Sequence, residues 1–495
     1  MNSFNDFLLT DAEITESRLG VPRENISNHT FEGNKIDLLI NGKDFFLAIY
    51  EDLEATKKGD FIWMTGWDIN SNVMLVPDPN DIEKSQHSTI QKVLIRAIER
   101  GVDVLILLNK NIYTPFTAKD FAKPLNDAAG YTVCLPDERH NSYFGSVHQK
   151  SWLIKRLNET VAYVGSMDVA SGRYDTKEHE HTEAWQMQPS FIQDYWGWTG
   201  GMLKIKGPAV IDIARHLYDL FSDPVPPYNG TTFTYVPEWA PPPVGVYSEQ
   251  SYIQTQLTAG QKGAVNYQYY SNWAPKGEMS LLAGILKAIA AAKKYIFISD
   301  QFLWYREIMD AVSAKLDDVE AVILLTDGYN SMDHYILWFD LTITSSTKAY
   351  YQYQALSKLK DHPKVHLYKT IKELLPDELR TIIYNHWKVI MIDDEYAIIG
   401  TAGIELAAMT NDIEINLGIY NPHLVTLFRK RLWAEFLNCD ENDPQLTDPI
   451  AATALWERTA AQQGRVRAYW PPDFEYHYIY RYVYDAFEPD GRLSS

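Results

Sequence analysis

The sequence contains few cysteines and fewer basic than acidic residues. Cys134 and Cys439 are the only cysteines among its 495 residues, so neither a disulfide framework nor a thiolate metal cluster is implied. Lysine and arginine together number 45, against 65 aspartate and glutamate residues, which gives a formal charge of −20. This charge opposes non-specific binding to nucleic acid and to anionic membrane surfaces. The composition therefore suits a reducing cytosol and makes nucleic acid an unfavoured partner.

Long apolar runs are also missing. The most apolar stretches, residues 104–108 and 321–325, have the length of buried strands and are far shorter than a membrane span. Residues 1–7 have neither the basic start nor the apolar run of a signal peptide. We therefore expect a cytoplasmic protein, or one exported by a signal-independent route, that touches a membrane only peripherally.

The chain is long and its helix and strand patterns alternate. With 495 residues, 46% of them hydrophobic, it can form two or three domains or one large pseudo-symmetric domain. The alternation predicts α/β sheets between layers of helices. Strand and helix patterns occupy residues 61–68, 90–98 and 104–108, and again 281–289, 295–298 and 321–325. Prolines between residues 223 and 243 mark a connection. We predict an N-terminal half at 1–223, a connecting segment at 224–260, a C-terminal half at 261–464 and an aromatic extension at 465–495.

Two short segments place a histidine two residues before a lysine. They are His148 with Lys150, and His386 with Lys388. In a strand, a spacing of two directs both side chains to one face. A third match, at residues 362–364, contains a proline that argues against an interior strand. The first two are each followed by a predicted hairpin that ends in glycine and a hydroxyl residue, Ser166 or Thr401, and later by an acid, Glu183 or Glu414.

This duplicated pattern resembles the phospholipase D superfamily, in which His-x-Lys, followed four residues later by Asp, occurs twice. The second copy matches in full, with Asp393 as the aspartate. Residues 165–168, 172–176, 206–210 and 298–302 resemble phospholipase D proper. The resemblance covers roughly residues 60 to 440. It implies two pseudo-symmetric α/β/α sandwich halves with the active site at their interface.

The residue types fit phosphodiester chemistry. Lys150 and Lys388 can screen the charge of the phosphodiester without a metal, so no cofactor is expected. A neutral imidazole can attack phosphorus while a protonated one donates to the leaving oxygen. The resemblance implies that His148 is the nucleophile and that His386 acts as acid and then as base.

Carboxylates are expected to hold the second nitrogen of each imidazole. The family places such acids at Glu183, expected to orient His148, and at Glu414, expected to orient His386. The remaining candidates are supporting residues. Ser166 and Thr401 would donate to the phosphate or steady their loops, Asp168 would be a polar partner in the first half, and Asp393, on the opposite strand face from its lysine, would be structural.

The chain departs from the family pattern at three positions. Lys155 replaces the aspartate of the first copy, Gly403 stands where the second copy usually has asparagine, and Glu405 replaces another polar residue. The loss at Gly403 removes an amide that would contact phosphate. Residues 178–181, Glu-His-Glu-His, suggest a divalent metal site as an alternative, but their place in the family predicts a polar rim instead.

Three functions are consistent with the sequence. The first is a phospholipase D-like phosphodiesterase that hydrolyses or transphosphatidylates a glycerophospholipid, releasing phosphatidate and a head-group alcohol. The second is another phosphodiester enzyme of the superfamily, such as a nuclease, which the charge of −20 disfavours. The third is a degenerate member that binds phosphate without turnover, suggested by Lys155 and Gly403. Because one chain carries both halves of the site, we expect a monomer.

Overall fold

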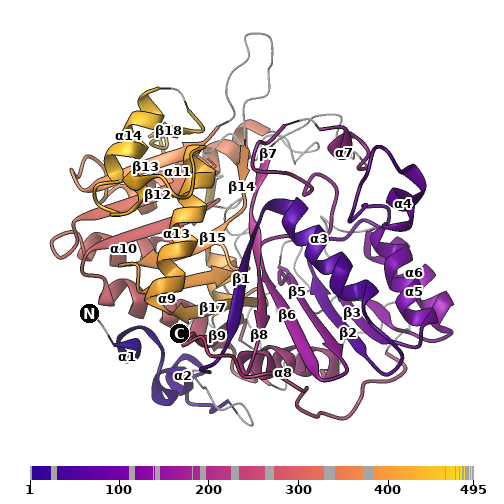
Figure 1. Ribbon diagram of the computed structural model, residues 1–495. Helices are drawn as coiled ribbons and strands as arrows, with labels where there is room; N and C mark the ends of the chain where they lie inside the picture. Colours follow the sequence, from indigo (N-terminus) through magenta and orange to yellow (C-terminus); the bar gives the residue numbers. More distant parts are fainter. Residues whose placement is uncertain are drawn as a thin grey trace.

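The computed structural model describes most of the chain and forms two α/β halves that lie side by side (Figure 1). The described residues are 3–23, 31–110, 117–137, 139, 145–180, 182–189, 197–223, 233–261, 273–327, 341–371, 383–462, 464–473, 475–478, 480, 481, 484, 490 and 492.

A seven-stranded sheet forms the first half. The three strands at one edge are parallel to one another, as expected for strands joined through helices, and the others pair antiparallel. The strand order is β1 (Lys35–Ile40), β8 (Gly201–Lys206), β6 (Glu159–Gly165), β5 (Ser151–Arg156), β2 (Phe61–Gly66), β3 (Asp103–Asn109) and β4 (Cys134–Asp137).

Helices cover both faces of this sheet because successive strand residues point to opposite sides. Ile62 and Met64 of β2 pack with α3 (Asn41–Glu54), α5 (Ile90–Glu99) and α6 (Thr117–Ala129). Trp63, between them, packs in a second core with α8 (Ala209–Ser222). Two short helices, α4 (Ile82–His87) and α7 (Glu183–Gln186), lie in the connections.

A nine-stranded sheet forms the second half and repeats this arrangement. Its order is β10 (Glu278–Met279), β9 (Tyr252–Ala259), β17 (Glu414–Tyr420), β16 (Tyr396–Gly400), β15 (Lys388–Ile392), β11 (Tyr295–Asp300), β12 (Ala321–Thr326), β13 (Val365–Thr370) and β18 (Val466–Ala468). The helices of this half are α9 (Ser280–Ala291), α10 (Arg306–Ala314), α11 (Leu341–Leu356), α12 (Leu406–Thr410), α13 (Pro422–Leu437) and α14 (Thr453–Ala461), with a 3-10 turn at Pro444–Leu446.

One hydrophobic core joins the two halves. It contains Leu217 of α8 from the first half, Phe428 of α13 from the second, and Trp387, which adjoins β15. A two-stranded parallel ladder between β7 (Gly197–Thr199) and β14 (Ile383–Asn385) also links them. The predicted fold of two α/β sandwich halves is therefore confirmed, and the junction between them is closely packed.

The boundaries of the halves differ from the predicted ones. The N-terminal helices α1 (Phe4–Phe7) and α2 (Asp11–Ser17) pack against α9 of the second half, where the Phe7 ring stacks on Tyr396 at 4.9 Å. Strand β9 lies within the predicted connecting segment 224–260, yet it belongs to the second sheet. Likewise, β18 lies within the predicted extension 465–495 and pairs with β13. Backbone pairing across the sheet, which composition does not reveal, sets these boundaries.

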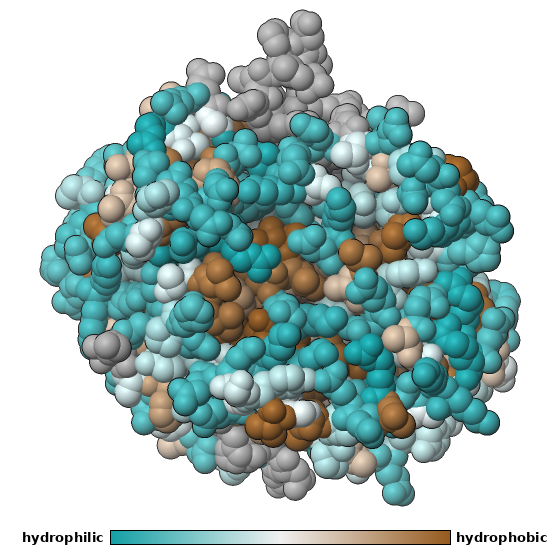
Figure 2. Space-filling model, viewed as in Figure 1, coloured by the Kyte–Doolittle hydropathy of each residue, from teal (hydrophilic) through white to brown (hydrophobic). Residues whose placement is uncertain are grey.

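Hydrophilic residues cover most of the face seen in Figure 2, and hydrophobic residues gather near the junction of the halves. Within the described ranges, no helix has the length and apolar character that crossing a membrane requires.

Candidate functional site at the junction of the halves

Each His-x-Lys segment is bound by backbone hydrogen bonds to the opposite half. The His148 N–H, just before β5, donates to the carbonyl of Ile413 at 3.0 Å. The His386 N–H, between β14 and β15, donates to the carbonyl of Thr199 at 2.8 Å. The two histidines therefore lie just before their strands, each secured by the other half. These two hydrogen bonds bring both motifs to the junction between the halves.

His148 pairs with the buried carboxylate of Glu414. The His148 Nδ1 atom lies 2.7 Å from Oε1 of Glu414, and the Thr401 hydroxyl donates to the other carboxylate oxygen. Glu414 has no exposed side-chain surface, and burial raises its pKa to about 7. Burial, followed by the charges of Lys150 and Lys388, lowers the pKa of His148 well below its usual value. The result is a neutral imidazole with Nδ1–H held by a carboxylate, which leaves the Nε2 lone pair available.

The predicted assignment of the two acids is not what the structure shows. Glu414 was expected to orient His386, but it contacts His148 of the other half. Glu183 was expected to be a buried acid on a strand; instead it is an exposed first residue of α7, whose N-cap is Thr182. The prediction for Glu183 as the partner of His148 is wrong because the chain turns into a helix there and Glu414 takes that position.

His386 is held by a backbone carbonyl. Its Nδ1 atom lies 2.7 Å from the carbonyl oxygen of Ser166, and since a carbonyl only accepts, this nitrogen carries the hydrogen. The ring packs against Trp198, with the ring centroids 4.9 Å apart. Burial lowers the pKa of His386 well below its usual value, and Lys388, Lys150 and other nearby cations add to this effect. No ion pair to His386 is found among the described residues.

The two lysines occupy equivalent positions. The Lys150 Nζ donates to the His148 carbonyl at 2.8 Å, and the Lys388 Nζ donates to the His386 carbonyl at 3.1 Å. Both side chains are buried, and burial lowers the pKa of Lys150 and brings that of Lys388 to about 8. Each therefore has an ammonium group in the low-dielectric centre, where attraction for an anion is strong.

Backbone hydrogen bonds and the Glu414 contact bring these groups together at the junction. The charge of each lysine lowers the pKa of both histidines, and protonation of His148 would lower the pKa of His386 further. Arg173 adds a third cation that acts on His386 and on Lys150, with its guanidinium 3.6 Å from the Trp198 ring centre. We did not single out Arg173 from the sequence, although it lies in the stretch 172–176 that resembles phospholipase D.

Aspartates connect the loops that surround the lysines. In the first half, Asp168 lies 3.9 Å from the Lys150 ammonium and accepts the N–H groups of Trp67 and Asp68 at 3.2 and 3.0 Å. In the second half Gly403 occupies the position of Asp168. Asp300, at the end of β11, instead accepts the N–H of Ile404 at 3.0 Å and those of Phe302 and Leu303 at 2.8 and 3.3 Å.

Asp300, from a strand that neighbours β15, thus accepts loop N–H groups as Asp168 does in the first half, and Gly403 leaves the expected amide absent at its own position. The signal was present in the sequence, since residues 298–302 carry part of the family resemblance.

The last motif residues lie outside the cationic centre. Asp393 is on the turn between β15 and β16, where its carboxylate accepts the N–H groups of Lys293, Lys294 and Tyr295 at 2.7, 2.8 and 2.8 Å. Lys155, at the equivalent place in the first half, is half-buried, and its ammonium donates to the carbonyl of Gly59 at 3.1 Å. These positions fit the structural role predicted for them.

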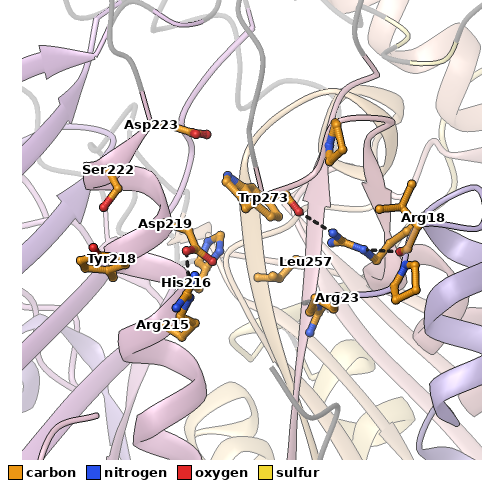
Figure 3. Close-up of a pocket in the computed structure, with 13 residues that line it drawn as sticks. Arg18, Arg23, Arg215, His216, Tyr218, Asp219, Ser222, Asp223, Leu257 and Trp273 are labelled. Atoms are coloured by element: carbon orange, nitrogen blue, oxygen red, sulfur yellow. Dashed lines mark hydrogen bonds and ion pairs between the residues drawn. The ribbon is translucent and has the colours of Figure 1, made fainter. Parts of the chain in front are cut away.

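Gln149, between the His148 and Lys150 positions, points in the opposite direction. Its amide nitrogen lies 2.5 Å from Nε2 of His216 on α8. Beyond His216 there is a cavity of about 370 Å³, drawn in Figure 3. Residues of α8 line one side of it and Arg18 and Arg23 the other, with Trp273 between them. This cavity is separate from the cationic centre.

In the stretch 178–181, His179 is buried in an ion cluster, whereas Glu178 and Glu180 are exposed. His179 Nδ1 lies 2.8 Å from Asp175, and Nε2 lies 3.0 Å from Glu435 of α13. These carboxylates outweigh burial and raise the pKa of His179 to about 9. Both ring nitrogens are therefore engaged in a link between the halves. In the described ranges, no three His, Cys, Asp or Glu side chains are grouped as a metal site. His181 lies outside the described residues.

The fold and the site define a duplicated α/β protein with a two-histidine, two-lysine centre at its internal junction. The family model described as cardiolipin synthase, PLD-like domain, matches residues 285–435. Phospholipase D alpha 4 of Arabidopsis thaliana is 21% identical over 82% of this chain and 65% of its own length. Major cardiolipin synthase ClsA of Bacillus subtilis is 22% identical over 82% of this chain and 71% of its own.

The fold recurs in phosphatidylserine synthase of Haemophilus influenzae, with a TM-score of 0.53, 12% identity and coverage of 93% of this chain and 95% of that one. The chain is thus similar to phospholipase D and cardiolipin synthase over most of its length. It spans about two thirds of the length of the first plant relative and 55% of phospholipase D beta 2 of Arabidopsis thaliana.

Proposed function

We propose that this protein is a metal-independent phosphodiesterase that acts on a glycerophospholipid through a phosphohistidine at His148. The observation that carries the proposal is the convergence of His148, held by Glu414, with His386 and two buried lysines. The printed names of the relatives, phospholipase D and cardiolipin synthase, support phospholipid as the substrate.

The proposed reaction has two displacements. In the first, His148 Nε2 attacks phosphorus, the bond from phosphorus to the head-group oxygen breaks, and His386 is placed to give a proton to that oxygen. Lys150 and Lys388 stabilise the charge that builds up on the phosphoryl oxygens. In the second, His386 takes a proton from water or an alcohol, whose oxygen attacks phosphorus and breaks the bond to nitrogen. Water yields phosphatidate, and an alcohol yields a new phosphodiester.

Hydrolysis and transfer share the intermediate, and one assay separates them. The wild-type protein and His148→Ala are incubated with phosphatidylcholine, phosphatidylethanolamine and single-stranded DNA, in EDTA and with ethanol present. We expect head-group release and phosphatidylethanol from the wild type alone. Cleavage of DNA without lipid turnover would refute the lipid assignment in favour of a nuclease. No turnover on a broad phosphodiester panel would favour a phosphate-binding member without catalysis.

A further inference from the structure

Within the described part of the chain, the acid that holds His148 has no counterpart in the other half of the site. Strand register identifies the equivalent positions. The Thr401 N–H donates to the Ile415 carbonyl at 3.0 Å, and the Ser166 N–H donates to the Gly201 carbonyl at 2.9 Å. Glu414 immediately precedes Ile415, and Gly200 immediately precedes Gly201. Gly200 is therefore the equivalent of Glu414 in the first half.

The hydrogen bonds to the histidines confirm this equivalence. His148 N–H binds the carbonyl of Ile413, immediately before Glu414, and His386 N–H binds the carbonyl of Thr199, immediately before Gly200. The two histidines are therefore anchored in the same way, but among the residues that the structure describes, a carboxylate contacts His148 and none contacts His386. His386 Nδ1 has the Ser166 carbonyl at 2.7 Å.

The surroundings of Gly200 retain features of an acid position. A Cβ atom built on Gly200 would lie 2.9 Å from the Ser166 hydroxyl, the counterpart of the Thr401 hydroxyl that donates to Glu414. The same Cβ would lie 3.6 Å from the indole nitrogen of Trp198, which is buried and has no hydrogen-bond partner in the described part of the chain. Its remaining close neighbour is the Met167 sulfur at 2.9 Å. Both 2.9 Å contacts are closer than a Cβ atom tolerates, so a side chain at position 200 requires the Ser166 and Met167 side chains to shift. Gly200 has no positive φ, so its backbone accepts other residues.

The charges that face His386 are cationic. Lys388 is two residues further along its own segment, and Lys150, Arg173 and His148 come from the first half. The carboxylates of Asp168, Glu405 and Glu414 act on the lysines. A backbone carbonyl orients the ring of His386 but supplies no full negative charge to stabilise an imidazolium.

We propose that Gly200 stands where a carboxylate is missing, that the Ser166 carbonyl holds Nδ1 of His386 in its place, and that the site therefore favours phosphodiesters whose leaving oxygen departs as a stable anion. Aryl phosphodiesters and phosphoanhydrides have such leaving groups, and they should be turned over faster than esters with alkyl leaving groups. This inference rests on the proposed function and ranks its substrates by their leaving group.

The proton balance gives the reason. When His148 Nε2 attacks, an alkoxide leaving group must take a proton from His386 as the phosphorus–oxygen bond breaks, whereas a phenolate or phosphate takes none. His386 can give this proton only as an imidazolium, and within the described ranges no carboxylate contacts its ring to stabilise that form. In the second step the neutral ring is ready to take a proton from water as the bond from phosphorus to His148 breaks. The site is thus poised as a base and poorly supplied as an acid.

The decisive variant is Gly200→Glu, with Gly200→Gln as a control of matched size and no charge. The first measurement is turnover of a series of methyl aryl and methyl alkyl phosphodiesters. The second is NMR titration of the His386 ring, assigned by its loss in His386→Ala. We expect wild-type kcat/KM to fall steeply as the leaving group becomes more basic. Gly200→Glu should raise alkyl relative to aryl turnover by about tenfold or more and raise the pKa of His386 by about one unit or more, while Gly200→Gln does neither.

Two outcomes would overturn the inference. One is equal wild-type turnover of alkyl and aryl esters. The other is a wild-type His386 that titrates near the ordinary value for histidine, a measurement that needs neither a folded variant nor activity. If wild type and His148→Ala are equally inactive on every ester, the proposed function fails, and the NMR titration still decides whether His386 lacks a stabilising carboxylate.

Discussion

Replacing Glu414 by glutamine tests the structure of the proposed nucleophile. The Thr401 hydroxyl donates to one oxygen of Glu414, and the other lies 2.7 Å from Nδ1 of His148. In Glu414→Gln the threonine keeps the amide oxygen on its own side, so the amide N–H₂ faces His148. A donor there selects the tautomer with its hydrogen on Nε2, the nitrogen that must attack phosphorus.

The magnitude follows from the contact that is lost. A hydrogen bond to a charged group contributes about 1.5–3 kcal/mol, which corresponds to roughly a 10- to 150-fold loss of kcat. The unfavourable tautomer adds to this. In a serine-protease triad, replacement of the buried aspartate by asparagine reduces kcat by about 10⁴-fold for the same reason. We therefore expect a loss for Glu414→Gln of about 10²- to 10⁴-fold.

The pH profile provides a second readout. Burial raises the pKa of Glu414 to about 7, so the carboxylate is protonated below that pH and accepts the Nδ1 hydrogen only above it. Wild-type kcat should rise with pH through about 7, and the Gln variant should lack this rise.

The assay is head-group release under single-turnover and steady-state conditions, with circular dichroism to verify folding. Glu183→Gln, on the exposed start of α7, is the matched control. A Glu414→Gln protein that keeps kcat within about threefold of wild type, with the same acid limb, would refute the orienting role.

Three further perturbations test other parts of the structure. Lys388→Met should lower turnover by about 10²-fold or more, as for other donors that stabilise a developing charge, and unchanged kcat in this variant would contradict the role of Lys388. Because burial lowers the pKa of Lys388 to about 8, wild-type activity should also fall above that pH. Asp175 and Glu435 raise the pKa of His179 from 6.5 to about 9 against the cost of burial. Its ion pairs therefore stabilise the fold fully below about pH 6.5 and are lost as pH rises through about 9, a change of about 3 kcal/mol or about 3 °C in Tm. The Tm difference between wild type and His179→Gln should shrink between about pH 6 and 9.5, and a constant difference would disprove the charged link. Glu183→Gln should leave kcat and its pH profile unchanged. A loss of kcat of about tenfold would show that Glu183 takes part in the reaction.

The sequence was most informative where local pattern and structure agree. Alternating apolar residues predicted β2, α5 and β3, and again α9, β11 and β12, because burial on one or both faces imposes the period of a helix or strand. The spacing of two in each His-x-Lys motif predicted that histidine and lysine leave one face of a strand. In the structure both histidines and Lys150 precede their strands, and each lysine donates to the backbone carbonyl of its own histidine. The spacing within each motif can be read without knowing the rest of the fold.

Asp300 shows why local reading had a limit. Gly403 stands where the resemblance predicts an asparagine, so the second hairpin was expected to lack a polar partner at the position that Asp168 holds in the first. The second half takes its carboxylate from β11, a strand about one hundred residues away in sequence that is hydrogen-bonded to β15. Only the order of strands in the sheet shows that one carboxylate can replace the other.

The sequence by itself determined the duplication, the α/β class and the two His-x-Lys motifs, because these depend on short-range spacing and burial. The tertiary structure alone decided which acid serves which histidine. The backbone of each histidine is hydrogen-bonded to the segment just before β17 or β8 of the other half, so Glu414 reaches His148, and His386 meets the Thr199 and Ser166 carbonyls. The physical reason is that a side chain's partner depends on distance in space, and at a junction between two sheets the nearest carboxylate belongs to the opposite half.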